Sequence, residues 1–135
     1  VLKRNKIDNM EIYQLAVTGD DRSTTDLYIS SGIGVTNSIA KSNKHKKIEV
    51  NCIQYEKALR DATVVKIDVE GAEYSYNIVQ PQLRGIILEF HPLSGKDWKS
   101  MANYIMLKIE ASGYKCIIRP SFKSGWSLTG CWVKI

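Results

Sequence analysis

The chain has few cysteines, few prolines and no long apolar run. Its three cysteines are odd in number and widely spaced, and no C-x-x-C pair or paired histidines accompany them. Neither a disulfide framework nor a structural metal site is therefore expected. This cysteine usage is typical of a reducing cytoplasm, which is the location we expect. No apolar run approaches the roughly 20 residues that a membrane helix needs, so we expect no membrane partner.

The composition is ordinary for a globular protein. The 135 residues are 44% hydrophobic and 24% charged, and this length favours a single domain. The net charge of +5 permits weak attraction to polyanions. A basic run at residues 41–47 could meet a phosphate or an anionic sugar, but such runs are more often solvated loops.

The most informative stretch is residues 64–73. Its first half is rich in valine and isoleucine, which predicts a buried strand rather than a half-exposed one. Its second half places Asp68, Glu70 and Glu73 around Gly71. Open α/β sheets build ligand crevices where a buried strand ends in this way and turns into a helix. An ordinary strand-to-helix turn, with Asp68 or Glu70 as a helix cap, explains the same spacing equally well.

Apolar spacing predicts the remaining elements. The best helix is expected at 96–112, ended by Gly113 in a left-handed conformation. A helix over 72–83 would be closed or bent by Pro81. The apolar face of the 96–112 helix is expected to consist of Trp98, Met101, Ile105 and Ile109. The other expected elements are a helix tail at 1–7, strands at 11–18, 25–30, 48–53 and 85–90, a short helix at 54–61, and two terminal strands at 114–119 and 127–135.

Residues 66–73 read K-I-D-V-E-G-A-E. This segment closely resembles the signature at the end of the fourth strand of the FkbM family of S-adenosylmethionine-dependent methyltransferases. Residues 16–20 are similar to the family's A-V-S-D segment, and residues 86–91 to its fifth strand, which ends E-x-H. Ser38 falls where members often have serine. The resemblance covers roughly residues 1–95 and implies an α/β, Rossmann-like methyltransferase sheet with a terminal antiparallel hairpin.

The resemblance also implies an activity. It indicates an O-methyltransferase that acts on a hydroxyl of a carbohydrate or small natural product, rather than on a nucleic acid. The acidic turn would lie near the sulfonium and the acceptor, where a carboxylate can stabilise positive charge or orient a hydroxyl. Gly71 would let the backbone approach a ligand. The cofactor-binding residues that follow from the resemblance are Ala16, Val17, Asp20, Asp68 and Gly71. No metal ligand is expected.

Two polar residues end the strand at 85–90. Parallel packing would place Glu89 and His91 beside Asp68. Histidine titrates near neutrality and could accept the hydroxyl proton, although a hydrogen bond to a loop is an equally good explanation of His91. A buried Glu89 would need a partner or a raised pKa, and either tends to mark a site. The candidate catalytic residues are Asp68, Glu70, Glu89 and His91. For Glu73, a favourable position at a helix N-terminus is the stronger explanation.

A complete family member begins with a strand and glycine-rich loop for the cofactor's methionine end, followed by a strand whose acidic residue holds the ribose. Neither segment is recognisable here. We therefore expect residues 1–135 to form a single partial domain, the carboxyl-terminal two-thirds of a methyltransferase domain. Weak or absent cofactor binding and lack of activity would follow for such a fragment.

The missing strands would leave the strand at 64–68 with a long apolar edge, which folded proteins avoid. We expect either the strand at 11–18 or a second copy of the chain to cover this edge. The alternative to an enzyme is a non-catalytic Rossmann-like module that binds a partner, or forms a homo-oligomer, through the same edge.

Overall fold

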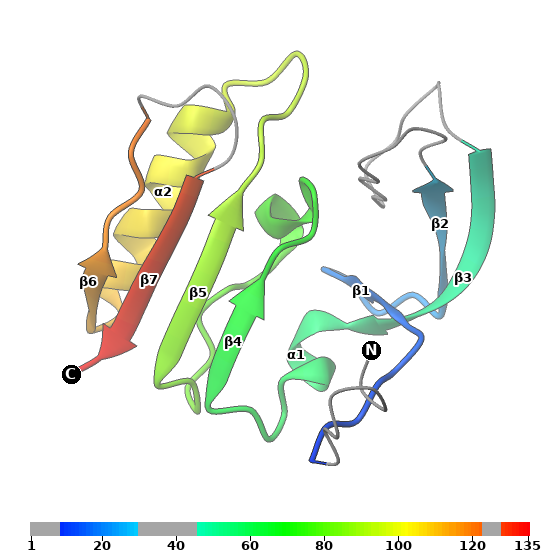
Figure 1. Ribbon diagram of the computed structural model, residues 1–135, viewed down its shortest axis with the longest axis horizontal. Coiled ribbons are helices and arrows are strands. Elements are labelled where there is room, and N and C mark those ends of the chain that lie inside the picture. The colour runs from blue at the N-terminus through cyan, green and yellow to red at the C-terminus, as the bar shows by residue number, and fades with distance from the viewer. Residues whose placement is uncertain (1–8, 30–45, 123–127) are drawn as a thin grey trace.

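The computed structural model describes residues 9–29, 46–122 and 128–135, which form a mixed α/β fold with two mixed sheets and few helices. The expected helix tail at 1–7 lies outside the described residues, as does the basic run apart from Lys46 and Lys47. In chain order the elements are β1 (Ala16–Thr18), β2 (Thr24–Ile29), β3 (Lys46–Gln54), α1 (Tyr55–Ala58), β4 (Val64–Ile67), the 3-10 helix η1 (Ala72–Ser75), β5 (Gly85–Phe90), α2 (Trp98–Ala111), β6 (Tyr114–Ile118) and β7 (Leu128–Lys134) (Figure 1).

The larger sheet has the strand order β4-β5-β7-β6 (Figure 1). β4 and β5 are parallel, whereas β7 runs antiparallel to both β5 and β6. The expected antiparallel pairing of the two terminal strands is thus confirmed. The smaller sheet has the order β1-β3-β2, in which β1 is parallel and β2 antiparallel to β3.

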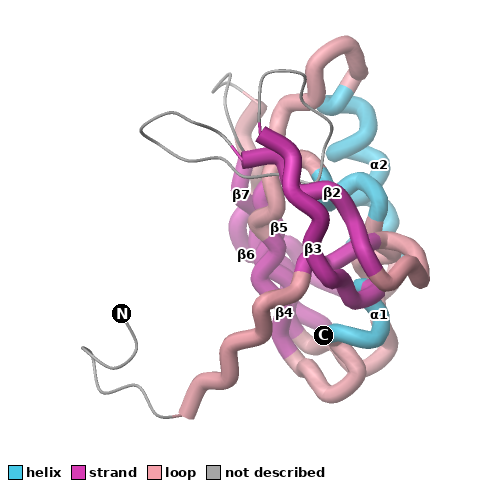
Figure 2. Tube along the Cα trace, turned by 90° about the vertical axis from the view of Figure 1, so that its right-hand side faces the viewer, coloured by secondary structure: helices cyan, strands magenta, loops and turns pink. Residues whose placement is uncertain are grey.

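Helix α2 covers one face of the larger sheet, and the main core lies between them. Figure 2 shows α1 and α2 on the same side of the strands. Trp132, Phe90 and Leu88 have no exposed surface, and burial of each such side chain stabilises the fold by roughly 1.5–3 kcal/mol. None of the helices within the described ranges is long and apolar enough to cross a membrane.

The start and end of α2 follow the expected signals. Asp97 caps the helix by accepting a hydrogen bond from the backbone N–H of Ser100 at 3.2 Å. Gly113 follows the helix with φ of 86°, a left-handed conformation that glycine adopts readily. The side chains that α2 buries are those of Ala102, Met106 and Ile109, with Trp98 and Ile105 packed against the core. Of the expected face, Ile109 is buried and Trp98 and Ile105 are partly buried against the core, whereas Met101 is partly buried without belonging to the core cluster.

The expectation that the strand in the signature is buried on both faces is wrong. In β4 the burial alternates, with Val64 59% exposed and Val65 8% exposed. Val65 faces the core on the α2 side, and Val64 lies on the opposite face, which neither described helix covers. Nor does the predicted strand at 11–18 reach β4: only Ala16–Thr18 form a strand, and they pair with β3. Within the described ranges, β4 is hydrogen-bonded to β5 alone.

The predicted helix over 72–83 is also wrong. Only η1 forms, and at Tyr76 the backbone turns to an extended conformation with φ of −92° and ψ of 145°. Tertiary contacts at this tyrosine replace helical ones: its ring stacks on Tyr55 at 4.8 Å, and its hydroxyl donates to the carbonyl oxygen of Val17 at 2.9 Å. Pro81 disfavours a helical conformation of the preceding residue, so the helix does not resume before β5.

Candidate functional site

The turn after β4 has an uncommon backbone. Glu70 has φ of 51° and Gly71 has φ of 101°, so two successive residues lie in the left-handed region. Glycine adopts this conformation easily, but for glutamate it carries a cost of order 1–3 kcal/mol. Such residues gather at functional sites, where the surrounding structure holds them in place. Here the turn directs Asp68 and Glu70 towards the end of β5, as the distances to His91 show.

Glu73 holds this turn against the end of β5. Its side chain has no exposed surface. One oxygen, Oε2, accepts a hydrogen bond from the backbone N–H of Gly71 at 2.8 Å. The other, Oε1, accepts from the backbone N–H of His91 at 2.6 Å. Sequence reasoning assigned Glu73 mainly to a helix N-terminus and missed this role. The available signal was a third carboxylate within the signature itself.

His91 lies at the centre of a group of carboxylates. Its Nδ1 lies 3.4 Å from Glu73 Oε1. Its Nε2 lies 3.6 Å from Glu70 Oε2, 3.7 Å from Asp68 Oδ1 and 3.9 Å from Glu89 Oε1. The structure therefore brings together all four candidate catalytic residues, because β4 and β5 are parallel neighbours and end at the same edge of the sheet. We call Asp68, Glu70, Glu89 and His91 the acidic cluster.

Electrostatics in the acidic cluster favour the charged imidazolium. The contact with Glu73 is the largest cause that raises the pKa of His91, and the charges of Glu70 and Glu89 act in the same direction. Desolvation opposes this rise, because only 12% of the histidine side chain is exposed. Glu89 is partly rather than fully buried, because 24% of its side chain is exposed to solvent. The expectation of a buried carboxylate is therefore met only in part.

One lysine accompanies the acidic cluster. Lys66 donates a hydrogen bond to Asp68 Oδ2 at 2.7 Å, and this contact raises the pKa of the lysine. More carboxylates than cations still meet here, so a positively charged group is favoured at this edge of the sheet. The ligand atoms of Asp68, Glu89 and His91 lie within 4.8 Å of one another, so these three residues could also hold a metal cation. Chemically, the cluster can attract a cation, orient a hydroxyl and accept its proton.

The remaining candidate cofactor residues lie on or just after β1. Ala16 and Val17 pair with residues of β3, and the Tyr76 hydroxyl links the Val17 carbonyl to the chain after η1. The Asp20 carboxylate forms an ion pair with Arg22, and hydrogen bonding from Arg22 lowers the pKa of Asp20. Ala16, Val17 and Asp20 therefore lie near the chain that follows η1 and do not belong to the acidic cluster. Asp68 and Gly71, by contrast, belong to the turn after β4.

Comparison with known proteins gives one match. A family model described as "Methyltransferase FkbM domain" matches residues 3–116, which is most of the chain. The matched segment includes the acidic cluster, the turn at Gly71 and the buried Glu73. No curated protein and no solved structure matches the chain.

Proposed function

The chain belongs to the FkbM methyltransferase family. From this premise we propose that it takes part in S-adenosylmethionine-dependent methylation of a hydroxyl on a carbohydrate or a small natural product. The observation that carries the proposal is the convergence of three carboxylates on His91 Nε2 at 3.6–3.9 Å. A Rossmann-like sheet is part of the proposal. Its support is that these groups lie at the carboxyl ends of adjacent parallel strands, where open α/β sheets bind ligands.

The chemistry of the donor fits the charge of the acidic cluster. S-adenosylmethionine, when bound, would supply the methyl group and leave as a neutral thioether. Asp68 and Glu70 would hold its positive charge near this edge of the sheet, and Gly71 would allow close approach of the backbone. Ala16, Val17 and Asp20 would contribute the more distant contacts (the adenine end).

The residues of the acidic cluster would act on the acceptor hydroxyl. As the acceptor oxygen bonds to the methyl carbon, its proton passes to His91 Nε2, which must be neutral beforehand. The neighbouring carboxylates stabilise the imidazolium that results, consistent with the raised pKa of His91. Glu73 fixes the histidine by binding its backbone N–H, and Tyr74 binds its carbonyl oxygen at 2.9 Å. Positioning supplies the larger part of the rate and proton transfer a smaller part.

Labelled methyl transfer to a panel of sugars and hydroxylated natural products tests this function. Calorimetry with S-adenosylhomocysteine comes first, and we expect binding weaker than micromolar; the assay therefore uses saturating S-adenosylmethionine. The expected lack of activity is tested first, on the unmodified chain. Against any rate that it shows, His91→Gln should lower the rate by about 10²–10⁴-fold, because the proton acceptor is lost. Asp26→Asn is the control, since Asp26 pairs with the exposed Lys47 on the smaller sheet. An unchanged rate in His91→Gln would contradict the proposed role.

A second function, partner binding, is favoured by the edge of β4. Within the described ranges, this strand is hydrogen-bonded on one side only. Its free backbone groups could pair with a strand of a second copy of the chain. Analytical ultracentrifugation tests this function: a dimer at micromolar concentration supports it, and a monomer throughout the accessible concentration range contradicts it.

A further inference from the structure

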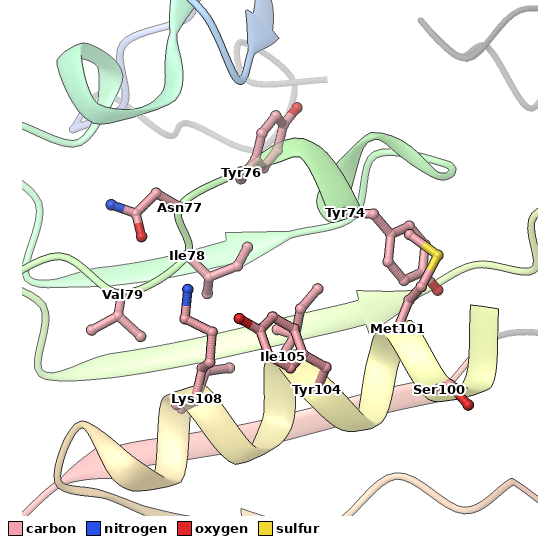
Figure 3. Close-up of a pocket in the computed structure, with 11 residues that line it drawn as sticks. Tyr74, Tyr76, Asn77, Ile78, Val79, Ser100, Met101, Tyr104, Ile105 and Lys108 are labelled. Atoms are coloured by element: carbon pink, nitrogen blue, oxygen red, sulfur yellow. The ribbon is translucent and has the colours of Figure 1, made fainter. Parts of the chain in front are cut away.

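An apolar groove of about 560 Å³ lies between α2 and the chain that follows η1. Figure 3 shows side chains of both segments pointing into it. Its floor is formed by Tyr76, Ile78 and Ile109, which are all buried. The groove lies where the sequence predicts a continued helix. The backbone is extended at Tyr76, and residues 77–80 form no helix, so no second helix of the described residues follows η1 along this flank of α2. Its volume is in the range of sites for small molecules.

The charge that the groove carries is positive. Lys108 is the charged residue among those that line it. Its Nζ extends from α2 towards the opposite wall (Figure 3) and lies 5.6 Å from the centre of the Tyr104 ring. No carboxylate of the described residues pairs with this lysine. The exposed amide of Asn77 stands on the facing wall and can donate to the same ligand group.

We propose that this groove binds a small amphiphile with an anionic carboxylate head and an unbranched apolar chain. The chain would lie on the buried floor, and the head would meet Lys108 and Asn77 at the mouth. The acidic cluster is an unsuitable place for this ligand, because its carboxylates would repel the head. The groove is therefore a second site, and the proposal does not depend on methyl transfer. A protein helix fits less well, because the mouth carries polar, exposed residues.

Calorimetric titration with dodecanoate below its micellar concentration tests the proposal, with dodecanol as the uncharged ligand. Lys108→Gln is expected to weaken dodecanoate binding by about 5–10-fold and to leave dodecanol binding unchanged, because a charge-assisted contact is lost. Lys99→Gln is the matched control. Lys99 is on the same helix and also lies over an aromatic ring, Trp98, at 5.9 Å, but it does not line the groove.

Chemical shift mapping gives an independent readout. Dodecanoate should shift backbone signals of residues 74–79 and 100–109, and shifts confined to other parts of the chain would overturn the proposal. Equal affinity for dodecanoate and dodecanol in the unmodified chain would also overturn it, as would an absence of binding. If a second copy of the chain covers the groove instead, the signals of residues 74–79 and 100–109 will change with protein concentration and not with dodecanoate, which would equally reject a ligand site.

Discussion

Replacing Glu73 by alanine is expected to lower the free energy of unfolding by about 3–5 kcal/mol. The carboxylate is completely buried and accepts hydrogen bonds from two backbone N–H groups, at Gly71 and His91. Its removal leaves both part-buried donors without this partner and also opens a space in the core. Urea denaturation, followed by circular dichroism, measures the change. Glu49→Ala, at an exposed position of β3, is the control and should change stability by less than about 0.5 kcal/mol.

The dependence of stability on pH separates the charge of Glu73 from its packing. The pKa of His91 is raised above its ordinary value of 6.5, and Glu73 is the first cause. A raised pKa in the folded state means that this stabilisation is fully present below pH 6.5 and is lost as the pH rises through the raised value. The unmodified chain should therefore lose stability in this window, and Glu73→Gln should lose less. Parallel pH profiles of the two proteins would show that the histidine is not coupled to Glu73.

The elements that the sequence predicts well are those whose patterns are local. The strand at 85–90, the helix ended by Gly113 and the terminal strands each carry their own apolar pattern, and all are present. The segment after Gly71 has a helical pattern as well, yet its helix ends at Ser75 and the backbone is extended at Tyr76. Its conformation depends on a stacking contact with Tyr55 and a hydrogen bond to β1, and both partners are distant in sequence. Local periodicity contains no information on such contacts.

The candidate site divides in the same way. Polar residues at the ends of two adjacent parallel strands must meet, so the sequence was sufficient to place Asp68 and Glu70 beside Glu89 and His91. The role of Glu73 could not be predicted in this way. It depends on two successive positive φ angles, which turn the backbone so that a first-turn glutamate points inward to the end of β5. Propensity would place a glutamate at this position in solvent.

Replacing Gly19 by alanine is expected to lower the free energy of unfolding by about 2–3 kcal/mol. A Cβ at this position would overlap the backbone carbonyl oxygen of Ser75, at the end of η1. A backbone group cannot move aside as a flexible side chain can, so β1 and η1 would have to separate. The hydrogen bond from the Tyr76 hydroxyl to Val17 would then lengthen or break. Urea denaturation measures this change too.

Gly95→Ala is the matched control for this substitution. Gly95 has φ of +72° and no atom within 4 Å of an added Cβ, so only backbone strain of about 1 kcal/mol is expected there. Because Ser75 follows Glu73 in η1, a displaced η1 should also disturb the hydrogen bonds that Glu73 makes. Gly19→Ala should therefore shift the amide signal of His91, which lies on a different strand end, whereas Gly95→Ala should not. Unchanged stability together with an unchanged His91 signal would contradict the close approach of β1 to η1.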